Sequence, residues 1–332
     1  MRRVLVTGGS GFIGCNFLRR VISERPETEW VNLDALTYAG RTENAEDFAD
    51  APNYRFVHGG IEDAALVDDL LSGGGAGGAF EAVVNFAAES HVDRSITGPG
   101  VFVETNVLGT QNLLETARRH GVGRFVQVST DEVYGSLQPD DPPFTEGSPL
   151  EPNSPYAASK ASADLLCRAY YETYGMPVIV TRCSNNYGPY QFPEKLIPSF
   201  IRNAMRDRPV PLYGDGLNVR DWLHVEDHCR AVALVLEKGS PGEVYNIGGG
   251  NERTNLEITR LVLEELGKGE ELISYVTDRL GHDRRYAIDS SYLQESLGWR
   301  PEHTFETGIR RTIEWYTNNT EWAFKVTAGK AD

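Results

Sequence analysis

The sequence has few cysteines and no long apolar run, and both absences narrow the class of protein. Its 332 residues include four cysteines, which are widely spaced and form no Cys-x-x-Cys pair. Such spacing is typical of small buried thiols in a reducing compartment, not of a disulfide framework. No apolar stretch approaches the roughly 20 residues needed to cross a membrane, and the apolar run from Val4 ends after three residues at a glycine turn. We therefore expect a cytoplasmic protein without a membrane partner.

Ligand spacing among the histidines and an excess of basic residues are also missing. His224 and His228 are four residues apart, but no further Cys or His completes a zinc set, so we predict no metal. The net charge of −16 argues against nucleic acid or an anionic membrane as the main partner. If the ligand is a diphosphate, a few arginines must overcome this negative field locally.

The chain does contain strand patterns that alternate with helical patterns. This alternation predicts an α/β fold with a doubly wound parallel sheet. We expect strands at 3–7, 30–34, 54–58, 82–87, 124–129 and 178–182, and helices at 12–22, 62–71, 100–119 and 156–174.

The regular alternation of strand and helix patterns ends at about residue 186, after which Pro, Gly and aromatic residues become more frequent. We predict a nucleotide-binding domain over 1–186 and a smaller C-terminal substrate-binding domain over 187–332. The segment at about 221–247, with an apolar helix and the strand 244–247, is expected to return to the large sheet.

Gly8, Gly11 and Gly14 lie between the first strand and the first helix. Their spacing permits a tight turn, close backbone approach to a pyrophosphate and contact between helix and sheet. Asp34 follows Gly14 by twenty residues, at the end of the second strand. A carboxylate there accepts hydrogen bonds from ribose hydroxyls and repels a 2′-phosphate, so the motif predicts NAD and not NADP.

Tyr156 and Lys160 are four residues apart and project from one face of a helix. A phenol is a poor base at neutral pH, since its ordinary pKa is about 10. We expect the neighbouring ammonium and the positive charge of a bound nicotinamide to favour phenolate, which would make Tyr156 a base for a hydroxyl proton.

With these motifs the chain resembles the extended short-chain dehydrogenases/reductases. Those enzymes place a Ser or Thr hydroxyl at the end of the fifth strand, where this sequence has Ser129 and Thr130. Epimerases of that superfamily usually have small residues where Asp131 and Glu132 stand. The acidic pair resembles the nucleotide-sugar 4,6-dehydratases, above all the dTDP-glucose 4,6-dehydratases. The similarity spans essentially the whole chain, including 32–40, 85–95, 182–189, 194–198 and 218–225. Gly60 departs from the pattern, because relatives commonly have an Asp there that touches the adenine.

The resemblance implies conversion of dTDP-glucose to dTDP-4-keto-6-deoxyglucose with bound NAD. Tyr156 would take the C4 hydroxyl proton, while Thr130 hydrogen-bonds the C4 oxygen and Lys160 holds the nicotinamide ribose. Removing water then needs a base for the C5 proton and an acid for the departing C6 hydroxyl. Two adjacent carboxylates divide these tasks if their environments separate their pKa values, so we assign Glu132 as the base and Asp131 as the acid.

The resemblance also implies binding residues. A planar guanidinium grips phosphate oxygens in two places, which suits Arg220 and Arg279 to the diphosphate. The expected cofactor contacts are Gly8, Gly11, Phe12, Ile13, Gly14, Asp34, Ala35, Leu36, Thr37, Ile61, Ala87, Ala88, Thr105, Ser129, Tyr156, Lys160, Cys183 and Asn186. The expected substrate contacts are Glu89, Ser90, Thr130, Asn185, Lys195, Leu196, Pro211, Tyr213, Arg220, Asn255, Arg279, His282 and Tyr286.

Helices 100–119 and 156–174 carry apolar residues over wide faces, and the superfamily pairs such helices in a homodimer. Three alternatives to the main prediction remain open. The chain could be a dehydratase of another nucleotide sugar or a nucleotide-sugar 4-epimerase. It could also be a non-catalytic NAD-sensing protein, although such proteins tend to lose the Tyr/Lys pair.

Overall fold

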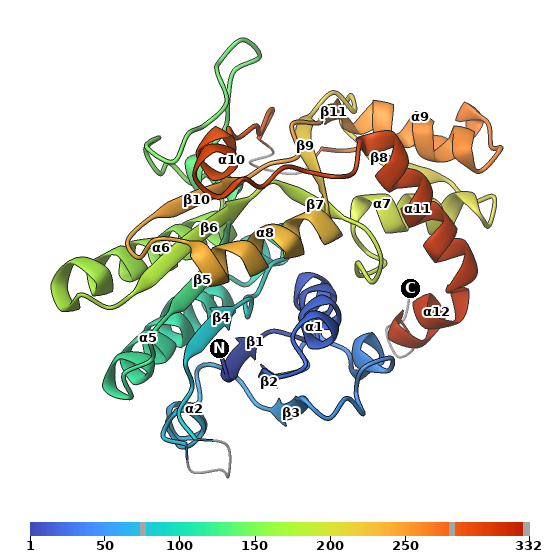
Figure 1. The fold of residues 1–332 in the computed structure, drawn as a ribbon. Coiled ribbons are helices and arrows are strands. Elements are labelled where there is room, and N and C mark those ends of the chain that lie inside the picture. The colour runs from blue at the N-terminus through green and yellow to red at the C-terminus, as the bar shows by residue number, and fades with distance from the viewer. Residues whose placement is uncertain (74–77, 279–282, 328–332) are drawn as a thin grey trace.

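The computed structural model describes residues 1–73, 78–278 and 283–327. Its main element is a seven-stranded sheet in which every neighbouring pair of strands is parallel, in the order β10-β6-β5-β4-β1-β2-β3. The predicted doubly wound fold is thus confirmed (Figure 1). The strands are β1 (Arg3–Thr7), β2 (Glu29–Asp34), β3 (Tyr54–His58), β4 (Ala82–Asn85), β5 (Phe125–Thr130), β6 (Val178–Cys183) and β10 (Val244–Ile247).

Helices cover both faces of this sheet. One apolar core joins the sheet to α1 and α8, and a second core joins it to α2, α5 and α6. All five residues of β1 are buried, as expected for a parallel strand with helices on both sides. The bounds are α1 (Phe12–Glu24), α2 (Ala64–Leu71), α5 (Thr110–Arg119), α6 (Pro155–Tyr174), α8 (Val225–Lys238) and α10 (Ser291–Leu297).

The helix predicted at 100–119 is continuous, but it is not an α-helix throughout. The chain forms α4 (Gly100–Phe102), then a π-helical segment, η2 (Val103–Gly109), and only then α5. The other short elements of this part are η1 (Thr42–Ala45), α3 (Val92–Thr97) and η3 (Asp131–Tyr134).

The smaller lobe packs around its own core, which includes Phe200, Val210, Ile258 and Ile309. β7 (Asn185–Tyr187), β9 (Val219–His224) and β11 (Glu252–Thr254) form one sheet, and β8 (Val210–Tyr213) pairs with β12 (Ile273–Val276). Its helices are α7 (Leu196–Ala204), α9 (Asn255–Glu265), η4 (Glu270–Leu272), α11 (Phe305–Asn318) and α12 (Thr320–Thr327). After β9, the chain returns to the seven-stranded sheet, where α8 packs against the sheet and β10 pairs with β6. The exact limits of the two domains stay a prediction. In the described ranges, no helix has the length and apolar character to span a membrane.

Candidate active site

The glycine turn after β1 leaves no room for side chains. Gly8 has a φ of +69°, and a Cβ atom there would lie 2.6 Å from the backbone nitrogen of Ala87. A Cβ atom on Gly14 would collide with the Gly8 carbonyl. The first turn of α1 therefore comes close to the strand ends, and its N–H groups and helix dipole face the position of a phosphate.

Asp34 ends β2 with its carboxylate held in place. Oδ2 accepts a hydrogen bond from the Ser10 N–H at 2.8 Å, and Oδ1 accepts one from the Leu36 N–H at 2.8 Å. Burial raises the pKa of Asp34, and these two backbone hydrogen bonds oppose the rise. A carboxylate has about four lone-pair sites, so Asp34 can still accept hydrogen bonds from ribose hydroxyls.

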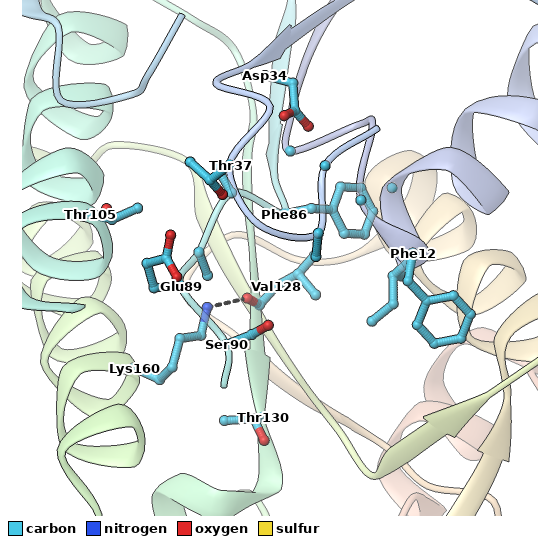
Figure 2. A pocket seen from close by; sticks show the side chains of 18 of the residues that line it. Phe12, Asp34, Thr37, Phe86, Glu89, Ser90, Thr105, Val128, Thr130 and Lys160 are labelled. Carbon is cyan, nitrogen blue, oxygen red and sulfur yellow. Dashed lines mark hydrogen bonds between the residues drawn. The ribbon is translucent and has the colours of Figure 1, made fainter. Parts of the chain in front are cut away.

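Tyr156 and Lys160 lie in the first turns of α6, which begins after the N-cap residue Ser154. The Lys160 ammonium donates to the Val128 carbonyl at 2.7 Å (Figure 2), and burial lowers the pKa of this lysine. Burial and the negative charge of Glu132 raise the pKa of Tyr156 well above its ordinary value. For Tyr156 to act as a base, Lys160 and a bound nicotinamide have to offset this rise, and that expectation stays a prediction.

Asp131 and Glu132 begin η3, directly after β5. Thr130 caps this turn: its hydroxyl accepts from the Glu132 N–H and donates to Asp131 Oδ1, both at 3.3 Å. Asp131 is only 2% exposed, and its Oδ2 has no hydrogen-bond partner within the described chain. Burial first, and then the charge of Glu132, raises the pKa of Asp131 well above its ordinary value. Asp131 therefore holds a proton more readily than an exposed aspartate does.

A single cleft at the carboxyl ends of the strands brings these groups together, where open α/β sheets bind ligands. It contains the acidic pair, the Tyr/Lys pair, Asp34 and the glycine turn. Leu36 is the one predicted cofactor contact outside the lining of this cleft. The others that line it are Gly8, Gly11, Phe12, Ile13, Gly14, Asp34, Ala35, Thr37, Ile61, Ala87, Ala88, Thr105, Ser129, Tyr156, Lys160, Cys183 and Asn186.

The predicted substrate contacts fall into two groups. Five of them line the cleft: Glu89, Ser90, Thr130, Asn185 and Lys195. Figure 2 shows Glu89, Ser90 and Thr130 in the same view as Lys160. Outside its lining lie Leu196, Pro211, Tyr213, Arg220, Asn255 and Tyr286, and outside the described residues lie Arg279 and His282.

Arg220 links the second group to the catalytic centre. Its guanidinium lies 4.4 Å from the ring centre of Tyr286 and donates to the Asp283 carbonyl at 2.9 Å. Its positive charge also acts to lower the pKa of Asp131, while the charge of Glu132 helps burial to raise the pKa of Tyr286. The two groups of residues are thus electrostatic neighbours.

Tyr38 and Glu62 are among the lining residues that were not predicted from the sequence. The Tyr38 hydroxyl is 2.9 Å from the Ser90 hydroxyl, and its ring lies 4.3 Å below the Arg94 guanidinium. Glu62 also lines the cleft, and its carboxylate occupies the space that a Cβ atom on Gly60 would fill. The sequence signal that could have indicated Glu62 was the glycine at position 60, because a residue without a side chain leaves room for the Glu62 carboxylate.

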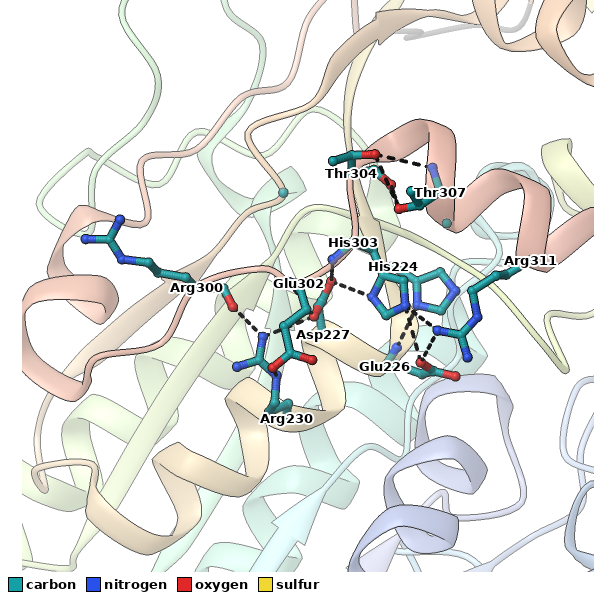
Figure 3. Close-up of polar contacts among 12 residues, drawn as sticks. His224, Glu226, Asp227, Arg230, Arg300, Glu302, His303, Thr304, Thr307 and Arg311 are labelled. Atoms are coloured by element: carbon teal, nitrogen blue, oxygen red, sulfur yellow. Dashed lines mark hydrogen bonds and ion pairs between the residues drawn. The ribbon is translucent and has the colours of Figure 1, made fainter.

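A second polar cluster, around His224 and His303, lies away from the cleft (Figure 3). Ligand atoms of these histidines and Glu226 lie within 4.8 Å of one another. The two rings stack at 4.1 Å, however, so their in-plane lone pairs do not converge on one point. The Arg311 guanidinium is 2.7 Å from His303 Nε2, and Asp227 Oδ2 is 2.9 Å from His303 Nδ1. We therefore interpret the cluster as an ion-pair network that joins β9 and α8 to α11.

The family of GDP-mannose 4,6 dehydratases matches residues 5–312. The chain belongs to this family of nucleotide-sugar dehydratases. A curated dTDP-glucose 4,6-dehydratase from Streptomyces antibioticus is 54% identical over 324 residues, which cover 96% of this chain and 93% of that relative. Another, from Salmonella typhimurium, is 49% identical and covers 98% and 96% of the two chains.

Solved structures give the same grouping. A dTDP-glucose 4,6-dehydratase from Streptomyces venezuelae, solved with NAD bound, has a TM-score of 0.93 and 53% identity, with 98% of this chain and 99% of that chain covered. A UDP-glucose 4-epimerase from Thermotoga maritima has a TM-score of 0.88 but 31% identity, with 96% and 99% covered. The similarity to dTDP-glucose 4,6-dehydratases expected from the sequence is thus confirmed.

Proposed function

We propose that the protein is a dTDP-glucose 4,6-dehydratase, which converts dTDP-glucose to dTDP-4-keto-6-deoxyglucose and water. The observation that carries this proposal is the Asp131–Glu132 pair beside Tyr156 in one cleft. An epimerase needs one base for the C4 hydroxyl, whereas dehydration also needs an acid at C6 and a base at C5. The raised pKa of Asp131 and its adjacent carboxylate neighbour meet this second requirement.

NAD is the cofactor that fits the cleft. The glycine turn gives a pyrophosphate close access to the backbone, and Asp34 is fixed to accept ribose hydroxyls. The same carboxylate would repel the 2′-phosphate of NADP. Bound NAD would accept hydride from C4 of the sugar and return it to C6.

For the oxidation, we assign Tyr156 as the base that takes the C4 hydroxyl proton and Thr130 as a donor to the C4 oxygen. Burial and Glu132 raise the pKa of Tyr156, so its base form needs positive charge close by. The Lys160 ammonium, on the same face of α6, supplies part of that charge and is placed to hold a ribose hydroxyl.

For the elimination, we assign two roles to the acidic pair. The C4 ketone makes the C5 hydrogen acidic, and Glu132 removes it as a proton. Asp131 donates its proton to the C6 hydroxyl, which leaves as water, and Glu132 later returns a proton to C5. The predicted order, oxidation before elimination, follows from the need for that ketone.

We assign the nucleotide diphosphate to the groups around Arg220. This arginine is buried, and Asn255 at the start of α9 has an Oδ1 without a hydrogen-bond partner in the described ranges. Lys195 completes the positive charge on the cleft side. These cations answer the local requirement for positive charge in a protein of net charge −16.

We further propose a homodimer formed by the face of η2 and α6. Large apolar side chains are exposed there: Val103 is 50% exposed, Leu108 57% and Leu165 56%. Exposed large apolar side chains on two elements that pack together are typical of a protein interface. The interface would bury the outer side of the helices that carry Thr105 and Tyr156.

The proposed activity is tested by incubating the purified protein with dTDP-glucose and measuring the product by mass spectrometry. We expect a mass loss equal to one water. An unchanged mass with an altered sugar configuration would indicate a 4-epimerase, and an unchanged substrate would indicate a binding protein. Repeating the assay with UDP-glucose tests whether the enzyme prefers thymine or uracil as the nucleotide base of its substrate.

A further inference from the structure

The last described helix, α12, lies beside the segment that follows β2. We call residues 37–45 of that segment the cofactor loop. The Trp322 Nε1–H donates to Asn44 Oδ1 at 3.0 Å, and the Arg41 Nε–H donates to the Val326 carbonyl at 3.4 Å. Figure 1 shows α12 next to the short helix of this loop, although about 275 residues separate the two in sequence.

Arg41 connects α12 to the wall of the cleft. Residues 37–40 line the cleft. Besides its contact with Val326, the Arg41 guanidinium donates through Nη1 to the carbonyls of Thr37 and Gly40, both at 2.8 Å. One side chain therefore ties both ends of the cleft-lining stretch to α12.

Asn44 connects α12 to the glycine turn. Asn44 is only 2% exposed, and its Nδ2 donates to the Ser10 carbonyl at 2.8 Å. The Ser10 N–H in turn donates to Asp34 Oδ2. A continuous chain of hydrogen bonds thus runs from Trp322 to the carboxylate assigned to the ribose.

The same Trp322 side chain anchors α12 in the smaller lobe. The Trp322 ring lies 5.0 Å from Trp315 of α11 and 5.5 Å from Tyr190, measured between ring centres. The helix therefore connects the lobe assigned to the sugar nucleotide with the loop that covers the cofactor cleft.

We propose that α12 is a clasp for the cofactor, with Arg41, Asn44 and Trp322 as positioning residues that slow its release. This inference rests on the proposed function. The dehydratase cycle returns the cofactor to its starting oxidation state, so release is not part of turnover. Residues 37–40 form part of the wall of the cleft assigned to the cofactor, and each hydrogen bond from the cofactor loop to α12 adds to the barrier for moving that wall.

The test is the rate of NAD dissociation from the holoenzyme, measured by displacement of labelled NAD with an excess of unlabelled NAD. Trp322→Phe keeps an aromatic ring and removes only the N–H donor to Asn44. We expect the rate to rise about threefold to tenfold, the effect of one lost hydrogen bond. Arg41→Lys keeps the charge but loses the planar fork, and we expect a change in the same direction.

Trp315→Phe is the matched control. This residue belongs to the same ring cluster, and its indole N–H has no hydrogen bond within the described ranges. We expect it to leave NAD dissociation within about twofold of wild type. Hydrogen exchange provides a second readout: the amide protons of residues 37–41 should exchange faster in Trp322→Phe than in Trp315→Phe, at equal melting temperature.

Two results would overturn the clasp. One is an unchanged NAD dissociation rate in both Trp322→Phe and Arg41→Lys, and the other is an equal acceleration in Trp322→Phe and Trp315→Phe. Binding of dTDP by the variants should match wild type. A wild-type protein that binds no NAD would contradict the proposed function together with the clasp, whereas normal NAD binding with identical rates in all variants would contradict the clasp alone.

Discussion

At the scale of single residues, the acidic pair after β5 shows how two adjacent carboxylates acquire different properties. Asp131 is buried, and the neighbouring negative charge adds to the cost of ionising it. Glu132 is only half-buried in the same cleft. This difference in environment is the condition under which one carboxyl group serves as an acid and its neighbour as a base.

Replacing Glu132 by Gln removes the base without a change in shape. We expect the sugar to be oxidised at C4 but not dehydrated, so reduced cofactor should accumulate on the enzyme while product formation falls by about 10²- to 10⁴-fold. The near-ultraviolet absorbance of the reduced nicotinamide measures the accumulation.

Asp131→Asn is the matched comparison for this experiment. It leaves the C5 base in place, so the C5 hydrogen should still exchange with heavy water, although loss of water is slow. Full turnover in Glu132→Gln would remove this residue from its assigned role. Wild-type product that retains the original hydrogen at C5 in heavy water would contradict the elimination step as a whole.

At the scale of elements, the sequence predicted the strands of the large sheet and the long helices beside it to within a few residues, because buried parallel strands and helices have distinct apolar periods. The short strands and the helices of the smaller lobe were not predicted individually. The segment 100–119 shows where such prediction ends. A π-bulge changes the hydrogen-bond register without changing the amino-acid pattern, and π-bulges are frequent at functional sites. Here the π-helical η2 places Thr105 in the cleft and lets Asn106 bond both the N–H and the carbonyl of Glu89.

The proposed dimer is tested on α6. Leu165 is exposed, so Leu165→Glu should fold normally but place a charge in the interface, and we expect the variant to be a monomer. The molar mass in solution, measured by light scattering after gel filtration, decides the outcome. Tyr275→Glu is the control, because Tyr275 is equally exposed but lies on β12 of the smaller lobe. Equal molar masses for the two variants would contradict this choice of face.

At the scale of the whole molecule, the spacing of residues predicted the Tyr/Lys pair and Asp34, whereas the residues around Arg220 were expected only from the family resemblance. Motifs with fixed spacing identify Tyr156, Lys160 and Asp34. Residues such as Arg220 and Tyr286 are far apart in sequence and become neighbours only because β9 and the chain after β12 meet. The pKa of Tyr156 also needs the structure, because it depends on burial by several elements at once.

Buried histidines predict how stability depends on pH. Burial lowers the pKa of both His224 and His228 to about 3. Below about pH 6.5 the two histidines bind protons in the unfolded chain but not in the folded chain. The free energy of unfolding should therefore be highest above that pH with respect to these two groups, and it should fall as the pH decreases toward 3. Each histidine contributes a slope of about 1.4 kcal/mol per pH unit in this window.

The contribution of one histidine is isolated by comparing wild type with His228→Gln, since buried carboxylates with raised pKa values, such as Asp221, act in the opposite direction. Denaturant unfolding at a series of pH values between 4 and 6 measures the slopes. We expect the slope of the unfolding free energy against pH to change in the variant by the amount that corresponds to about one proton. Parallel curves for the two proteins would contradict this assignment.

The position of β10 has a consequence for how the protein is made. This strand pairs with β6 at one end of the large sheet, yet it emerges from the ribosome about sixty residues later. Until then, β6 presents a row of unpaired backbone groups, the kind of edge on which chains associate wrongly. A nascent chain stalled shortly after residue 186 should therefore need a chaperone, and a gene cut at that point should yield aggregates instead of a nucleotide-binding fragment.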